Sequence, residues 1–153
     1  MIDFLITLST FLSMEGITWL THRFVMHGFL WNLHKDHHNK NPHSFFERND
    51  YFFVIFAIPA ICLFALGTFF PTLSGLFYIG LGITLYGFAY FMVHEIFIHQ
   101  RFKILNRTDN IYFRAIRKAH KVHHKHLGKE EGECFGMLMV PLKYFLEASK
   151  KSK

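Results

Sequence analysis

The sequence predicts an all-α integral membrane protein, in which a bundle of three to four transmembrane helices carries a histidine-rich cap on the cytoplasmic side. Three observations lead to this fold class. The 153 residues are 51% hydrophobic yet carry a net charge of +6, a mixture that suits a small membrane protein. Three apolar stretches are long enough to cross a bilayer. Ten of the 12 histidines form four short groups that follow these stretches. At this length a single domain, residues 1–153, is expected.

The three apolar stretches account for the bundle. Residues 2–20 are apolar except for Asp3, Glu15 and small polar residues, whereas residues 51–70 and 73–93 contain no charge. At about 1.5 Å of helix rise per residue, each stretch can cross a hydrocarbon core of roughly 30 Å. A carboxyl group that faces lipid is unfavourable. Glu15 is therefore expected to face other helices and to form a buried hydrogen bond that fixes their packing.

The third stretch also contains four glycines, which suit close packing of helices in lipid: Gly75, Gly80, Gly82 and Gly87. After it, residues 111–126 are predicted to form a basic helix that Thr108 or Asp109 caps and Gly128 stops. Residues 135–146 are apolar but short, which favours an interfacial or re-entrant segment. A fourth span is the alternative for this last segment.

The distribution of positive charge orients the bundle. Of the 17 Lys and Arg residues, four lie in residues 21–50 and 13 in residues 101–153. None precedes the first span or lies in the turn between the second and third spans. With three spans, all 17 fall on one side of the membrane, which is the cytoplasmic side by the positive-inside bias. The histidine groups fall on the same side.

The histidines follow a pattern that occurs twice. A pair five residues apart comes directly after the first span and again after the third, and each pair precedes a triplet with the spacing H-x-x-H-H. On an α-helix such a triplet lies on one face within about one turn. The ten residues are His22, His27, His34, His37, His38, His94, His99, His120, His123 and His124. This repeat suggests that each half contributes one pair and one triplet to a shared centre.

Neutral imidazole is a common ligand of iron, zinc, copper and nickel. Because one zinc ion takes about four ligands, ten imidazoles are too many for one metal ion and suit two, which makes the cap a di-metal centre. The pairs present a geometric problem, since residues five apart on an ideal helix are roughly 140° apart. Either their members bind from the flanks of the site, or the helix loosens there. Asp36 and Glu95 are candidates to orient the outer ring nitrogens of the ligands.

At these residues the sequence resembles a known family. The four histidine groups look like those of the membrane fatty acid hydroxylase superfamily, and three stretches resemble the bacterial β-carotene hydroxylases within it. These stretches are Phe-Glu-Arg-Asn-Asp at residues 46–50, residues 90–101 around the second pair, and residues 119–130 around the second triplet. The resemblance covers nearly the whole chain.

The resemblance implies a membrane non-haem di-iron monooxygenase that hydroxylates β-ionone rings of carotenoids at carbon 3, converting β-carotene to β-cryptoxanthin and zeaxanthin. It implies dioxygen as oxidant and a ferredoxin or similar protein as electron donor. The ten histidines would be the iron ligands, and zinc can replace iron in a purified sample. His43 and His126 have no counterpart in the family pattern. The implied location is the bacterial inner membrane, with the histidine motifs in the cytoplasm and the carotenoid entering from the lipid.

Other functions fit the sequence less well. A fatty acid or sterol hydroxylase or desaturase would share the metal site, so it stays open. A membrane haem protein needs histidines that face each other across spans, and the second and third spans contain none before His94. A metal transporter needs polar ligands near mid-membrane, where Glu15 is the one candidate. A nucleic-acid partner would explain the positive charge but not the spans, so none is expected.

Overall fold

The computed structural model describes residues 1–39, 44–105 and 107–150, and every regular element in these ranges is a helix. In chain order these are α1 (Ile2–Leu20), the π-helix η1 (Thr21–Phe29), α2 (Trp31–His38), the short 3₁₀-helix η2 (Arg48–Asp50), α3 (Tyr51–Phe69), the 3₁₀-helix η3 (Pro71–Leu73), α4 (Gly75–Phe91), the π-helix η4 (Met92–Ile98), α5 (Ile111–His123) and α6 (Leu142–Lys150). The all-α prediction is confirmed.

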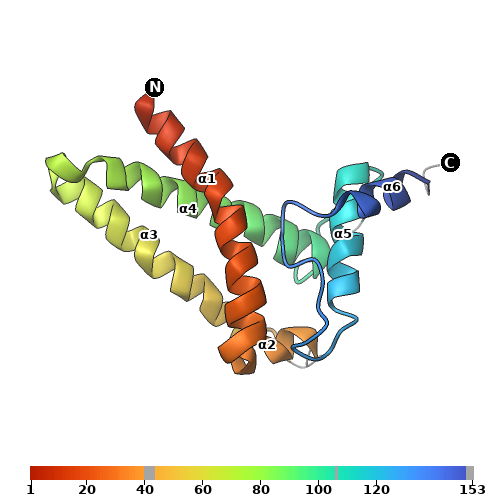
Figure 1. Ribbon diagram of the computed structural model, residues 1–153. Coiled ribbons are helices and arrows are strands. Elements are labelled where there is room, and N and C mark those ends of the chain that lie inside the picture. Colours follow the sequence, from red (N-terminus) through yellow and green to blue (C-terminus); the bar gives the residue numbers. More distant parts are fainter. Residues whose placement is uncertain (40–43, 106, 151–153) are drawn as a thin grey trace.

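Three helical segments, each made of two consecutive elements, are long and apolar enough to cross a membrane: Ile2–Phe29, Arg48–Phe69 and Gly75–Ile98. In Figure 1, α3 and α4 form a hairpin that α1 crosses, and the N-terminus and the α3–α4 turn lie at one end of these segments. Helices α2, α5 and α6 gather at the other end. The chain is therefore a membrane protein with three candidate spans and a helical cap, and no fourth candidate occurs among the residues described.

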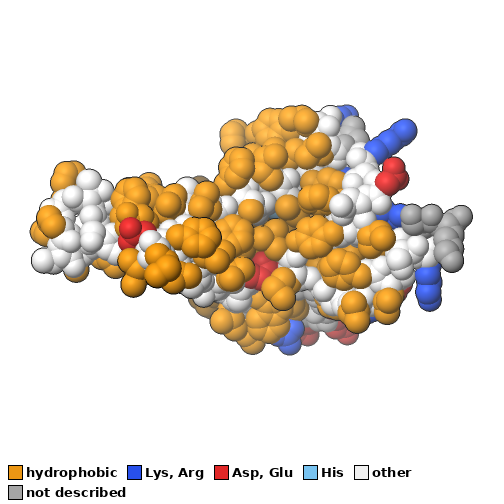
Figure 2. Space-filling view, turned by 90° about the horizontal axis from the view of Figure 1, so that it is seen from above, with side chains coloured by type: hydrophobic (Ala, Val, Ile, Leu, Met, Phe, Trp, Pro, Cys, Tyr) orange, Lys and Arg blue, Asp and Glu red, His pale blue; other side chains and the backbone are white. Residues whose placement is uncertain are grey.

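Hydrophobic side chains cover the surface of the spans. Figure 2 shows them in patches along the narrow part of the molecule and across much of its wider part, with most of the visible Lys and Arg side chains at the opposite end. Large side chains such as Phe4, Leu12 and Ile61 are more than 60% exposed. Such continuous apolar exposure is unfavourable in water and normal against lipid.

The helices of the bundle approach closely at two of the four expected glycines. A Cβ atom at Gly82 of α4 would lie 2.6 Å from Thr10 Cβ on α1, and one at Gly80 would lie 3.1 Å from the Ala60 carbonyl on α3. Gly87, by contrast, has open space beside it. The packing role predicted for these glycines therefore holds at Gly80 and Gly82 and is wrong at Gly87.

Glu15 fixes the packing of the spans against the C-terminal segment. Its Oε1 accepts hydrogen bonds from the backbone N–H groups of Met137 (2.9 Å), Leu138 (3.0 Å) and Met139 (2.9 Å). Its Oε2 accepts one from the Tyr86 hydroxyl of α4 at 2.6 Å. The predicted role in helix packing is thus confirmed and extended, because one carboxylate joins α1, α4 and the chain that follows the cap, although Glu15 is half-buried and not fully buried as expected.

The C-terminal region lies on the cap and does not span. Helix α6 has nine residues and packs on α5 through a small core of Ala115, Ala119, Tyr144 and Ala148. The residue that caps the N-terminus of helix α5 lies one or two positions after the predicted ones. Asn110 Oδ1 accepts from the Tyr112 and Phe113 N–H groups, while Thr108 Oγ1 accepts from the Asn110 N–H and so supports the capping residue instead of capping the helix.

Candidate metal centre

The structure brings all ten predicted histidines together at the cap, in two adjacent groups. Nine of them form two sets whose candidate ligand atoms lie within 4.8 Å of one another. His124 joins the second set, because its Nε2 lies 2.8 Å from His120 Nε2. Group A is His22, His27, His34, His38 and His123, and group B is His37, His94, His99, His120 and His124.

Each group takes one histidine from the triplet that mainly serves the other group. Group A takes the first pair and the outer members of the first triplet, His34 and His38, but the middle member of the second triplet, His123. Group B takes the second pair, the outer members of the second triplet and the middle member of the first, His37. Residues at i and i+4 thus serve one group, and the residue at i+3 reaches across to the other. The internal repeat predicted from the sequence becomes a shared, two-part centre.

Local unwinding resolves the geometry of the histidine pairs. The first pair, His22 and His27, lies in the π-helix η1, whereas in the second pair His94 lies in the π-helix η4 and His99 is the residue directly after it. A π-helix closes i→i+5 hydrogen bonds, so residues five apart come onto the same side. At the second pair the bond joins the two histidines themselves, since the His99 N–H donates to the His94 carbonyl at 2.9 Å. Of the two arrangements considered for the pairs, the structure has the one in which the helix loosens.

The outer ring nitrogens of group A face neutral oxygens. Four of them lie within 3.0 Å of backbone carbonyls in one segment, residues 126–135, which we call the carbonyl strap. The pairs are His22 with Phe135, His27 with Lys129, His38 with His126, and His123 with Glu133. The fifth, His34 Nδ1, lies 2.7 Å from Asn49 Oδ1. Cys134, between two of the carbonyls that face the site, has a φ of 61°.

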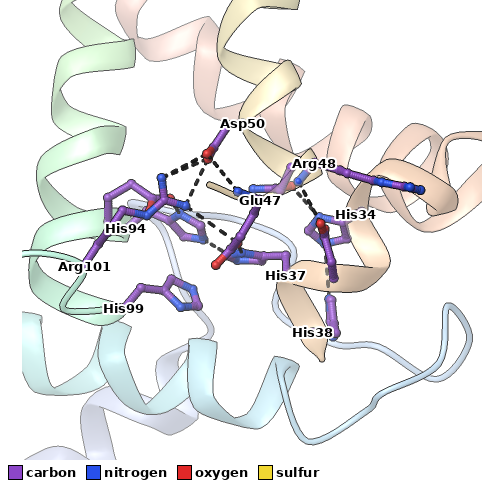
Figure 3. A network of polar contacts seen from close by, with 12 residues as sticks. His34, His37, His38, Glu47, Arg48, Asp50, His94, His99 and Arg101 are labelled. Atoms are coloured by element: carbon purple, nitrogen blue, oxygen red, sulfur yellow. Dashed lines mark hydrogen bonds and ion pairs between the residues drawn. The ribbon is translucent and has the colours of Figure 1, made fainter. Parts of the chain in front are cut away.

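Carboxylates hold two histidines of group B. His37 Nδ1 lies 2.7 Å from Glu47 Oε2, and His94 Nδ1 lies 2.6 Å from Glu95 Oε1. Arg101 connects these carboxylates, with its Nε 2.9 Å from Glu95 Oε2 and an Nη 3.7 Å from Glu47 Oε2. The same guanidinium donates to both oxygens of Asp50. Figure 3 shows Arg101 and Asp50 on the outer side of His37 and His94.

The inner nitrogens require a cation between them. Each of the ten Nε2 atoms lies within 3.2 Å of another Nε2. Where an acceptor oxygen holds the proton on Nδ1, Nε2 of a neutral imidazole carries only a lone pair. In the pairs His22–His34, His34–His38, His27–His123 and His37–His94 both partners are of this kind. Two facing lone pairs repel, so the donor set fits metal ions.

Burial favours the neutral form of several of these imidazoles, and metal ligands must be neutral. Removal from water lowers the pKa of His37 and His120 well below the ordinary value, and neighbouring histidines lower it further. Burial likewise lowers the pKa of His38 to about 4, of His123 to about 3 and of His124 to about 2. These ligands are therefore uncharged and do not repel a metal cation.

Two predicted orienting residues behave differently. Glu95 contacts His94, as expected, whereas Asp36 Oδ2 accepts from the Arg48 N–H at 2.7 Å and so ties α2 to η2. Sequence reasoning missed Glu47 and Asn49 as partners of His37 and His34, although both belong to the quoted stretch 46–50. His126 contributes its carbonyl and stands outside both groups. His43 lies outside the described residues.

A mostly apolar cavity of about 220 Å³ adjoins the centre. It lies between α1, α3 and α4, with His22 of group A and Asn49 at the cap end and Met14, Ala60 and Ile83 among its other lining residues. Two of its hydroxyl groups are engaged elsewhere, since Thr84 donates to the Gly80 carbonyl and Tyr86 to Glu15. The cavity therefore offers an apolar ligand a place beside group A.

Comparison with known proteins agrees with this architecture. The profile of the fatty acid hydroxylase family matches residues 7–146. The chain is 38% identical to the β-carotene hydroxylase of Paracoccus sp. (strain PC1), over 92% of this chain and 86% of that protein. It is 37% identical to the β-carotene hydroxylase of Pantoea ananas, over 97% of this chain and 83% of the relative. The chloroplastic β-carotene 3-hydroxylase 1 of Arabidopsis thaliana is 38% identical over 90% of this chain and 44% of the plant protein. No solved structure matches the chain.

Proposed function

The chain belongs to the fatty acid hydroxylase family, and from this premise we propose that it is a non-haem di-iron monooxygenase that hydroxylates the β-ionone rings of carotenoids at carbon 3. The observation that carries the proposal is the contact between an apolar cavity and a double histidine centre, through His22. The names of the relatives supply the substrate. The ten histidines of groups A and B are the proposed ligands, five for each iron ion.

The cavity suits one end of a long apolar molecule. Its volume of about 220 Å³ is below the roughly 300–1,000 Å³ of pockets that enclose a drug-sized ligand. One ring and the adjoining chain would enter, while the rest of the carotenoid stays in the lipid between the spans. The apolar walls, Phe52 and Phe56 among them, would bind the ring through hydrophobic contact and exclude water from the reacting carbon.

Iron in this centre would supply activation of dioxygen. One oxygen atom would enter the C–H bond and the other would leave as water, with two electrons from a ferredoxin-type donor and two protons from water. The Nδ1–H groups of these histidines donate hydrogen bonds to the strap carbonyls, Asn49, Glu47 and Glu95. Their Nε2 lone pairs therefore stay directed inward. In this proposal the chain is one domain in the bacterial inner membrane, with the centre facing the cytoplasm, where such a donor is found.

Pigment analysis of cells that make β-carotene tests the proposal. Expression of the chain should yield β-cryptoxanthin and zeaxanthin, and His123→Ala should abolish both. Ala60→Phe should fill the cavity and block hydroxylation while the metal content stays at two ions. Ala65→Phe, on the exposed side of the same helix, is the matched control and should be active. Unchanged β-carotene together with a hydroxylated or desaturated fatty acid or sterol would contradict the carotenoid assignment.

A further inference from the structure

We propose that the two metal positions are inequivalent, and that group B binds a divalent metal ion more tightly than group A because buried carboxylates back its ligands. This inference rests on the two-metal centre of the proposed function and goes beyond it. It assigns Glu47, Glu95 and Arg101 as positioning residues of group B. It also predicts an order in which the centre fills and empties.

Group A is surrounded by neutral acceptors. All five of its outer nitrogens face an uncharged oxygen, four from the carbonyl strap and one from Asn49. A backbone carbonyl fixes the ring and its tautomer but adds no net charge beside the metal ion. None of these five acceptors therefore carries a formal charge that would offset the +2 charge of an ion in group A.

Group B lies beside formal negative charge. Its His37 and His94 donate to Glu47 and Glu95, whose side chains are 5% and 1% exposed. The guanidinium of Arg101, itself 8% exposed, faces Glu47, Glu95 and Asp50 at once. Three carboxyl groups thus lie around one guanidinium on the side of group B, and two of them, Glu47 and Glu95, contact its histidines directly.

Two effects then favour a cation in group B. An imidazole that donates to a carboxylate is a more basic ligand than one that donates to a carbonyl. The carboxylates also attract the ion directly, and in a buried site this attraction is only weakly screened. Burial alone would favour tighter binding in group A, because His99 and His124 of group B are only half-buried. The charge of the carboxylates, rather than access, therefore sets the expected difference.

The test is the release of Co²⁺, a divalent ion with a visible spectrum, from the purified full-length protein in detergent. The protein is loaded with Co²⁺ and titrated with a chelator, while bound metal and the Co²⁺ absorption bands are recorded. Two separate steps of one ion each are expected. His123→Ala should remove the weak step, and His37→Ala should remove the tight one.

Conservative variants locate the cause. Glu47→Gln and Glu95→Gln keep an acceptor oxygen but remove the charge, and each should weaken the tight step by about 10- to 100-fold. Asn49→Asp adds a carboxyl group behind His34 of group A and should strengthen the weak step. Glu133→Gln is the matched control, since its carboxylate contacts Lys143 and Tyr144 and only its carbonyl faces His123. Both steps should stay unchanged in this variant.

The outcomes separate the inference from the function beneath it. Release of both ions in one step from the native protein, or a tight step that survives Glu47→Gln and Glu95→Gln unchanged, would overturn the inequivalence and leave the hydroxylase assignment intact. A native protein that holds only one ion would overturn the two-metal centre and with it the proposed function. Circular dichroism of each variant shows whether its helices have formed.

Discussion

Buried histidines such as His38 and His123 make the stability of the metal-free protein depend on pH. The pKa of His38 falls to about 4 and that of His123 to about 3 in the folded protein, against 6.5 for the free side chain. Below pH 6.5 the unfolded chain therefore takes up protons that the folded protein does not. Stability is then lost as the pH falls from 6.5 toward the folded values, by up to about 1.4 kcal/mol per pH unit for each such residue.

Thermal unfolding of the metal-free protein between pH 8 and pH 4 measures this effect. The melting temperature should be level above pH 7 and should fall steeply below 6.5. In the metal-bound protein, protons compete with metal for every imidazole, so metal loss should be cooperative in the same direction. A shallow curve that corresponds to the uptake of one proton would contradict the coupled burial of several histidines.

Alanine substitution of individual histidines distinguishes ligands from bystanders. Any change within groups A and B should remove most hydroxylase activity, and several should lower the metal content from two ions per chain. His126→Ala should retain both, because the residue contributes a backbone carbonyl to His38, and His43→Ala is expected to do the same. Metal analysis and product formation on each purified variant are the measurements. Damage from His126→Ala equal to that from His123→Ala would refute the ligand assignment.

The sequence predicted the convergence of the histidines better than it predicted their supports. Spacing alone places His34 and His38 on one helical face, since four residues make about one turn. The strap carbonyls carry no side-chain signature, and Glu47 reaches His37 only because residues 44–50 fold back beside α2. Such acceptors become visible once the chain is folded. Glu95 was predictable because it adjoins His94.

At the scale of the elements, Glu15 links the spans to the strap. Its carboxylate accepts from three successive N–H groups just beyond Phe135, whose own carbonyl faces His22. Glu15→Ala should leave these donors without their acceptor and cost about 3 kcal/mol or more. Glu15→Gln retains one acceptor oxygen and should lose less. Limited proteolysis at residues 136–141 and thermal unfolding measure the change, and equal stability of both variants would contradict this role.

The contact of α1 with α4 depends on the absence of a side chain at Gly82. A methyl group there would meet Thr10 Cβ at 2.6 Å and the Thr7 carbonyl at 2.7 Å, so Gly82→Ala should destabilise the protein by about 1–3 kcal/mol. Gly16→Ala, on α1 with nothing within 4 Å of the added atom, is the control and should cost little. Thermal unfolding in detergent compares the two. Equal melting temperatures would argue against close packing at Gly82.

The elements also show which parts of the fold hydropathy can predict. The three spans follow from the length of the apolar stretches, and for the short segment after Phe135 the alternative of a fourth span finds no candidate helix among the described residues. The π-helices were foreseen only as one of two options, because a five-residue spacing by itself does not say whether a helix unwinds. The i→i+5 hydrogen bond from the His99 N–H to the His94 carbonyl forms within the folded cap. The contacts of that cap cannot be inferred from the spacing of residues.

At the scale of the whole molecule, charge and chemistry coincide at one end. In the part of the chain that the structure describes, the Lys and Arg residues belong to the segments around the histidine cap, and the N-terminus and the α3–α4 turn lie at the opposite end of the spans. The positive-inside bias places such an end in the cytoplasm. In the proposed orientation a cytoplasmic electron donor would reach the cap, while the cavity lies between the spans, within reach of an apolar substrate.

Cysteine labelling in intact cells tests this orientation. In a variant with Cys62→Ala and Cys134→Ser, a cysteine is introduced either at Thr72, in the α3–α4 turn, or at Leu127, which is 62% exposed in the cap. A maleimide that does not cross membranes should label Thr72→Cys from outside and reach Leu127→Cys only after the cells are opened. Because all 17 positive side chains would have to cross the membrane to invert the protein, no mixed labelling is expected. External labelling of Leu127→Cys with protection of Thr72→Cys would reverse the topology and place the metal centre on the outer face.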